Sequence, residues 1–137
     1  MDQRLSFLTV AGPVADAARF YLDGLGWTAL LHVPGEVLML QVAPGLVLAV
    51  HETASFAADT GDAGRPAGLS LAHNVGSEAE VDAVVADLEA AGAEVLHRPR
   101  RSAWGGWFAH VRDPLGVVWE VAHNPGWSVG PDGTVSL

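Results

Sequence analysis

The stretch V-A-G-P-V-A-D-A-A-R-F-Y-L-D-G-L-G-W, residues 10–27, is followed half a chain later by a weak copy of itself. The copy, V-G-S-E-A-E-V-D-A-V-V-A-D-L-E-A-A-G-A, spans residues 75–93. Each follows an apolar, strand-like run and reaches a glycine, Gly26 or Gly92, near its end. A repeat at this offset predicts two copies of one supersecondary module. A pocket between paired modules is then the expected place for a small-molecule site.

The first copy is flanked by segments rich in β-forming residues. Residues 5–11 have strand-like composition, and the following Gly12-Pro13 offers a helix start, because proline is favoured at the first helical position. Apolar residues at helical spacing predict a helix over residues 13–24. Three more strands are expected, at residues 27–33, 37–42 and 46–52. The first module is therefore predicted to have the order β-α-β-β-β.

The second module repeats this order. Ser77 and Glu80 form the S-x-x-E signature of a helix start, and an apolar stripe from Val81 to Leu88 runs along the helix until Gly92 ends it. The expected strands are residues 69–75, 93–97, 107–112 and 117–123, with residues 98–106 as a loop.

These elements predict an α+β fold in which two tandem βαβββ modules form curved mixed sheets around a pocket. A length of 137 residues fits one domain. Within it we expect modules at residues 1–53 and 67–124 and a C-terminal tail at residues 125–137. The linker between the modules is expected at residues 54–66, with room for a short helix at residues 55–58.

Composition and charge exclude several classes of protein. The net charge of −9 argues against nucleic acid and anionic membranes as partners, because both attract basic surfaces. No apolar run has the length that a bilayer requires, and the N-terminus lacks the features of a secretory signal. The chain has no cysteine, which excludes disulfides, thiol nucleophiles and thiolate-bound metals. A cytoplasmic protein is expected.

Particular motifs, together with the repeat, resemble those of a known family. The segments F-Y-L-D-G-L-G-W (residues 20–27) and D-P-L-G-V-V-W-E (residues 113–120) are similar to segments of the vicinal oxygen chelate superfamily. That superfamily contains glyoxalase I, extradiol dioxygenases and bleomycin-resistance proteins. The segments W-G-G (residues 104–106) and W-E-V-A-H-N-P-G-W (residues 119–127) further resemble an uncharacterised glyoxalase-like bacterial subgroup.

The resemblance also implies where a metal would be bound. In metal-using members four strands each place one inward ligand, usually His or Glu. Carried over by position, these ligands fall on Leu5, Ala49, Ser70 and Glu120. Three or more good ligands are generally needed, and only Glu120 is one. We therefore expect no metal and no other cofactor, unless a substitute such as His51 rebuilds the site.

Glu120 is open to several interpretations if no metal is bound. An inward carboxylate in a mostly apolar pocket could act as a general acid or base. It could equally accept a hydrogen bond from an amine or hydroxyl of a ligand. The third alternative is a structural carboxylate satisfied by neighbouring backbone groups or by an arginine.

Four other residues are candidates for ligand binding. Trp104 and Trp107 belong to the run W-G-G-W and could stack on a planar ligand, although tryptophan is also a common core residue. His51 lies two residues beyond Ala49 and so on the same strand face, although a histidine at a strand end is often exposed. His110 could line the mouth of a cavity.

The missing ligands favour metal-independent binding of a small organic molecule, in the manner of bleomycin-resistance proteins. The alternative is a glyoxalase-like lyase or isomerase, with Glu120 as acid or base or as ligand of a rebuilt metal site. A scaffold without a small ligand is a third hypothesis, so enzymatic activity is left open. We also expect a homodimer, because in many relatives a neighbouring chain completes the pocket and symmetric dimers are the commonest oligomers.

Overall fold

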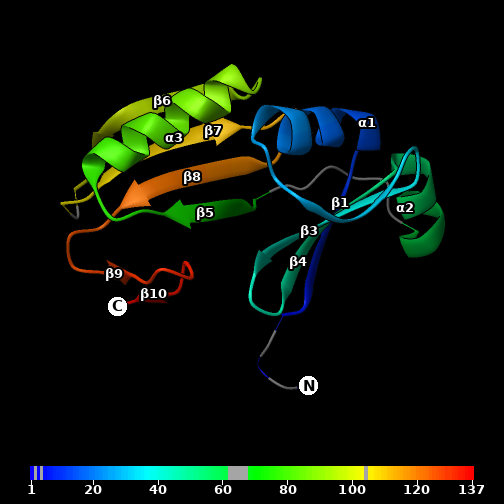
Figure 1. The fold of residues 1–137 in the computed structure, drawn as a ribbon, viewed down its shortest axis with the longest axis horizontal. Coiled ribbons are helices and arrows are strands. Elements are labelled where there is room, and N and C mark those ends of the chain that lie inside the picture. The colour runs from blue at the N-terminus through cyan, green and yellow to red at the C-terminus, as the bar shows by residue number, and fades with distance from the viewer. Residues whose placement is uncertain (2, 4, 62–67, 104) are drawn as a thin grey trace. The chain divides into compact units, whose positions relative to one another are not determined.

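The computed structural model describes residues 1, 3, 5–61, 68–103 and 105–137, in two compact units, residues 1–67 and 68–137 (Figure 1). The first unit contains β1 (Phe7–Ala11), α1 (Val14–Ala17), η1 (Ala18–Gly24), β2 (Ala29–Val33), β3 (Val37–Ala43), β4 (Leu46–His51) and α2 (Thr53–Thr60). Its sheet has the strand order β1-β4-β3-β2, in which β1 and β4 are parallel and the other neighbours antiparallel.

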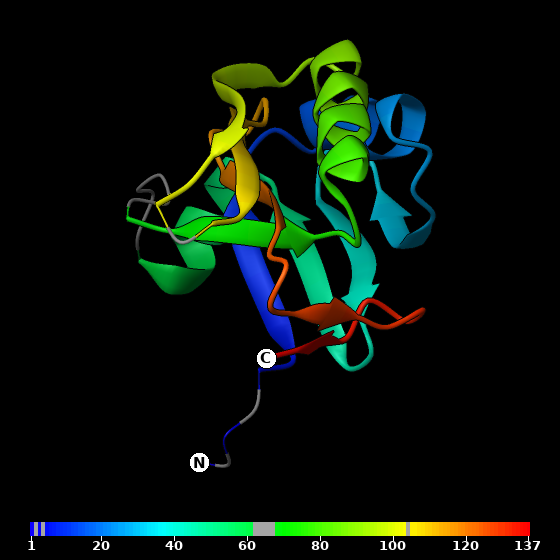
Figure 2. The same cartoon turned by 90° about the vertical axis from the view of Figure 1, so that its left-hand side faces the viewer.

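The second unit repeats this topology. It contains β5 (Ser70–Asn74), α3 (Glu78–Ala90), β6 (Glu94–Arg101), β7 (Trp107–Arg112), β8 (Val118–His123), β9 (Ser128–Val129) and β10 (Val135–Ser136). The order β5-β8-β7-β6 matches that of the first sheet, with β5 and β8 parallel. Figure 2 shows the terminal hairpin β9–β10 (red) beyond the end of β8 (orange). The prediction of two βαβββ modules with mixed sheets is confirmed.

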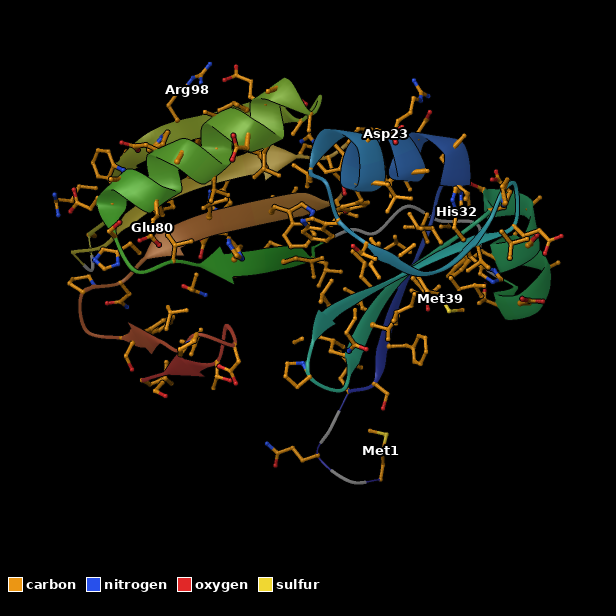
Figure 3. All side chains as sticks on the ribbon, in the orientation of Figure 1. Met1, Asp23, His32, Met39, Glu80 and Arg98 are labelled. Atoms are coloured by element: carbon orange, nitrogen blue, oxygen red, sulfur yellow. The ribbon has the colours of Figure 1, made fainter. Side chains whose placement is uncertain are left out.

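Helix α3 begins with reciprocal hydrogen bonds between side chains and backbone. The Ser77 hydroxyl accepts a hydrogen bond from the Glu80 N–H at 3.2 Å, and the Glu80 carboxylate accepts one from the Gly76 N–H at 3.0 Å. Figure 3 shows Glu80 at this end of the helix. These bonds satisfy N–H groups that have no partner within a helix. At the other end Gly92 adopts a φ of 108°, a conformation that side-chain-bearing residues rarely adopt.

The helix predicted over residues 13–24 is present, but only its first turn, Val14–Ala17, is α-helical. After Ala17 the chain continues as the π-helix η1, in which the Leu25 N–H donates to the Phe20 carbonyl, five residues back. Phe20 and Tyr21 are adjacent in sequence, yet each is only 1 % exposed, and their rings meet edge to face. The wider π turn accompanies the burial of both neighbouring rings, which an α-helix would direct further apart.

Two segments are more regular than predicted. Helix α2 contains the short helix expected at residues 55–58 and extends it at both ends. Strand β6 continues through Arg101, so the first half of the predicted loop at residues 98–106 pairs with β7, Arg100 with Phe108 and Arg101 with Trp107. Pro99 is tolerated there because β6 is an edge strand, where a missing N–H breaks no ladder between inner strands.

Each sheet packs one face against helix, and we call the opposite face the open face, although Ala49 and Ala122 on it are buried. In the second unit Ala109, Val111 and Val121 are completely buried, on the face that packs against α3. In the first unit Val10, Leu38 and Val50 form an equally buried row. Side chains alternate along a strand, so the intervening residues of these strands lie on the open face. None of the helices in the described residues is long and apolar enough to span a membrane.

The N-terminal cap of α3 should contribute measurably to stability. We expect Ser77→Ala to lower the free energy of unfolding by about 1 kcal/mol, the usual cost of losing a capping hydroxyl. Chemical denaturation followed by circular dichroism measures this. Ser128→Ala, at an exposed position of β9, is the control, with an expected change within about 0.5 kcal/mol. Equal effects of the two substitutions would contradict a capping role.

Candidate functional site

A row of polar side chains crosses the open face of the second sheet, on three neighbouring strands. His97 of β6 is in register with His110 of β7, and His110 is in register with Glu120 of β8. Ala72 of β5 completes the row beside Glu120. Residues in register on one face have side chains close enough to interact. We call His97, His110 and Glu120 the polar row.

His110 and Glu120 are in direct contact. The Nε2 atom of His110 lies 3.3 Å from Oε2 of Glu120, and the two side chains are 24 % and 33 % exposed. The ring of His110 also meets the rings of Phe108 and His97 edge to face, at centroid distances of 5.5 and 6.1 Å. The pair is therefore held by aromatic neighbours but remains within reach of a molecule in solvent.

The second ring nitrogen of His110 is unusual. Its Nδ1 atom is buried and has no hydrogen-bond partner among the described residues. Buried polar atoms in folded proteins nearly always have a hydrogen-bond partner. In a neutral imidazole one nitrogen donates and the other accepts. With Nε2–H directed at Glu120, Nδ1 is an acceptor, and the pair can bind a proton or release one.

The other predicted ligand-binding residues do not join this pair. Trp107 lies three positions before His110 in β7, and this odd spacing places it on the opposite face. Its Nε1–H donates to Asp82 of α3 at 2.8 Å. There it lines a groove of about 360 Å³ formed by α3 and β6. Trp104 lies outside the described residues. His51 is half-buried at the end of β4 in the first unit, in register with Ala11 of β1.

The metal positions carried over from the family do not provide a ligand set. Leu5 precedes β1 and is 63 % exposed, Ala49 is buried in the middle of β4, and Ser70 is the first residue of β5. Only Glu120 has a side chain that binds divalent metals well. Within the described part of the chain, no three His, Cys, Asp or Glu side chains are grouped so as to hold a metal ion. The residues present therefore do not fit the metal of the family.

Sequence reasoning did not identify His97 as part of the site. Its partner across the sheet depends on how β6 pairs with β7, and that pairing shifts register on both sides of His97. The corresponding row of the first unit consists of Leu31, Met39, Ala49 and Thr9. It has no ionisable group, so the polar row belongs to the second unit alone.

Comparisons with known proteins identify the family to which this fold belongs. The model of the Glyoxalase/Bleomycin resistance protein/Dioxygenase superfamily matches residues 6–121. A glyoxalase-related enzyme from Fulvimarina pelagi is 37 % identical, with 98 % of each chain covered and a TM-score of 0.89. No protein of curated function matched the chain.

Two more distant structures share the fold only. One is a glyoxalase/bleomycin resistance protein/dioxygenase from Nocardioides, 24 % identical, with coverage of 95 % of this chain and 89 % of the other and a TM-score of 0.72. The other is a lactoylglutathione lyase from Agrobacterium tumefaciens, 22 % identical, with coverage of 90 % and 96 % and a TM-score of 0.66.

A histidine outside the polar row should make stability depend on pH. Partial burial lowers the pKa of His73, in β5, below the 6.5 of a free histidine. The unfolded chain then binds the proton more readily than the folded one. The free energy of unfolding therefore decreases as the pH falls through 6.5 toward the pKa of His73 in the folded chain. Well above pH 6.5 His73 is neutral in both states, so it adds no pH dependence there.

We accordingly expect the free energy of unfolding to decrease from pH 7 to about pH 5, and His73→Gln to reduce that slope. Denaturation at a series of pH values measures it. His32→Gln, an exposed histidine of β2 in the first unit, is the control, with a slope like that of the unmodified protein. An unchanged slope in His73→Gln would show that other groups set the pH dependence.

Proposed function

The chain belongs to the glyoxalase/bleomycin resistance protein/dioxygenase superfamily, and we propose that it binds a small organic molecule on the open face of its second sheet, without a metal ion. The observation that carries the proposal is the contact between His110 and Glu120, whose side chains are partly exposed.

The surroundings of the pair support binding. Small-molecule sites are mostly apolar, with a few polar groups that fix the orientation of the ligand. Phe108 and Ala72 supply apolar surface next to the pair, while Glu120 accepts hydrogen bonds and His110 can accept or donate.

A glyoxalase-like lyase or isomerase is the second candidate, and the same contact favours it. A carboxylate and an imidazole 3.3 Å apart can take a proton from one atom of a substrate and return it to another, as such reactions require. Glu120 would act as the acid or base in direct contact with the substrate, and His110 would share the proton. A rebuilt metal site has less support, because the described residues contain no suitable group of ligands.

Binding can be tested with a metabolite and antibiotic screen by protein-observed NMR in buffer containing EDTA. We expect some compounds to perturb the amide signals of β7 and β8. Glu120→Gln should lower the affinity for these compounds by about tenfold, the effect of losing one charge-assisted hydrogen bond. Trp107→Phe is the matched control, because Trp107 lies on the opposite face of β7, and it should leave binding unchanged.

The outcomes separate the alternatives. Compounds that bind equally well to Glu120→Gln, or that bind only in the presence of a divalent metal, would contradict the proposal. Conversion of a bound compound into an isomer or cleavage product, abolished by Glu120→Gln, would establish the second candidate instead.

We further propose that the protein is a homodimer. Leu5, Phe7 and Leu31 of the first unit are 63, 51 and 44 % exposed, and a partner chain that covered them would remove this apolar surface from water. A second copy of the chain is the simplest partner. Light scattering at micromolar concentration should give twice the chain mass, and Phe7→Glu should shift it toward the monomer while circular dichroism stays unchanged. A monomeric unmodified protein would refute this.

A further inference from the structure

Arg100 differs from the other described arginines in its charge partner. Four of them pair with carboxylates: Arg19 with Asp16, Arg98 with Glu89, Arg101 with Glu78 and Arg112 with Glu94. The guanidinium of Arg100 instead lies over the ring of Phe108, 5.3 Å from its centroid. It has no carboxylate partner in the part of the chain that the structure describes.

Strand β6 separates its three arginines between the two faces of the sheet. Arg98 and Arg101 pair with glutamates of α3, and Figure 3 shows Arg98 extending outward on the helix side. Arg100 is in register with Phe108, and Phe108 lies two residues from His110 in β7. Residues two apart in a strand share a face, so Arg100 belongs to the open face, one row along from the polar row.

The other charged residues named on this face, Arg112 and Glu120, each contact an oppositely charged or protonatable side chain, which leaves the guanidinium of Arg100 for a ligand. Arg112 is paired with Glu94 at 2.7 Å, and Glu120 is in contact with His110 at 3.3 Å. A guanidinium presents a planar fork of N–H donors that matches a carboxylate in two parallel hydrogen bonds. Contact with the Phe108 ring limits the directions in which this fork can point, which lowers the entropic cost of binding.

The net charge of −9 does not prevent an anion from binding here. Repulsion from distant carboxylates is screened over about 8 Å at physiological salt, whereas a contact with Arg100 acts at hydrogen-bond distance. The local contact therefore dominates over the overall charge.

We propose that the ligand of the open face carries a carboxylate that pairs with Arg100, while its uncharged part lies along Phe108 toward His110 and Glu120. This inference rests on the proposed function and specifies its ligand class, a small organic acid. Arg100 is then the residue that determines specificity for acids over their uncharged analogues.

The test compares two probes that differ only in charge, benzoate and benzamide. Their affinities are measured by NMR titration of the ¹⁵N-labelled protein, from the amide signals of β6, β7 and β8. We expect benzoate to bind at least about fivefold more tightly than benzamide, with the ratio falling to about one in Arg100→Gln. Arg98→Gln is the matched control, two residues away on the other face, and should keep the ratio.

Each outcome decides the proposal. Equal affinities in the unmodified protein, a preference for benzoate that persists in Arg100→Gln, or no perturbation of these strands by benzoate would overturn it. If benzamide binds with no advantage for benzoate and Glu120→Gln weakens it, the acid specificity fails while the proposed function stands. If benzoate binds through Arg100 but Glu120→Gln has no effect, the role of Glu120 fails and the assignment of Arg100 stands.

Discussion

The pairing of β7 with β8 is the constraint on which the site depends. Ala109 lies opposite Val121, and both are fully buried on the face that packs against α3. A slip of one residue would turn these side chains to solvent and direct the neighbouring His110 and Glu120 under the helix. Burying an unpaired carboxylate costs several kcal/mol. The apolar residues that pack against α3 therefore set the register that places His110 and Glu120 on the open face.

The two units show how little of the chemistry comes from the fold itself. Both sheets have the same strand order and the same buried rows under helix. In the first unit, however, Met39 lies opposite Ala49, where the second has His110 opposite Glu120. One backbone framework thus presents a row without ionisable groups in one copy and the polar row in the other. Function in such a protein has to be argued from the side chains of a site.

The sequence predicted most of the fold because local signals and the repeat agreed. The cap at Ser77 and the apolar stripe of α3 are local, and both are present in the structure. The second half of β6 could not be predicted, because R-P-R-R is basic and contains a proline, a composition typical of loops. It forms a strand through pairing with β7, which is an interaction between distant residues.

The site was only partly predictable for a related reason. Glu120 came from the family resemblance. Trp107 and His110 were both predicted to bind the ligand, but their odd spacing in β7 places them on opposite faces. His97 and Arg100 required the register of β6, which shifts twice along its pairing with β7. Arg98 and Arg100 are near neighbours in β6 but lie on different faces of the sheet. The pairing of β6 with β7 shows which residues each of them meets.

Glu120 has a histidine as its charge partner in the structure. A carboxylate that is two-thirds covered needs a compensating positive or hydrogen-bonding group. In the family that partner is the metal, whereas here Ala49 and Ser70 offer no strong ligand and His110 stands 3.3 Å away. An imidazole balances the carboxylate with a proton that can move, and a metal ion would balance it with a fixed charge. His110 and Glu120 thus give this face groups suited to hydrogen bonding and proton transfer, and Arg100 adds a fixed positive charge at its edge.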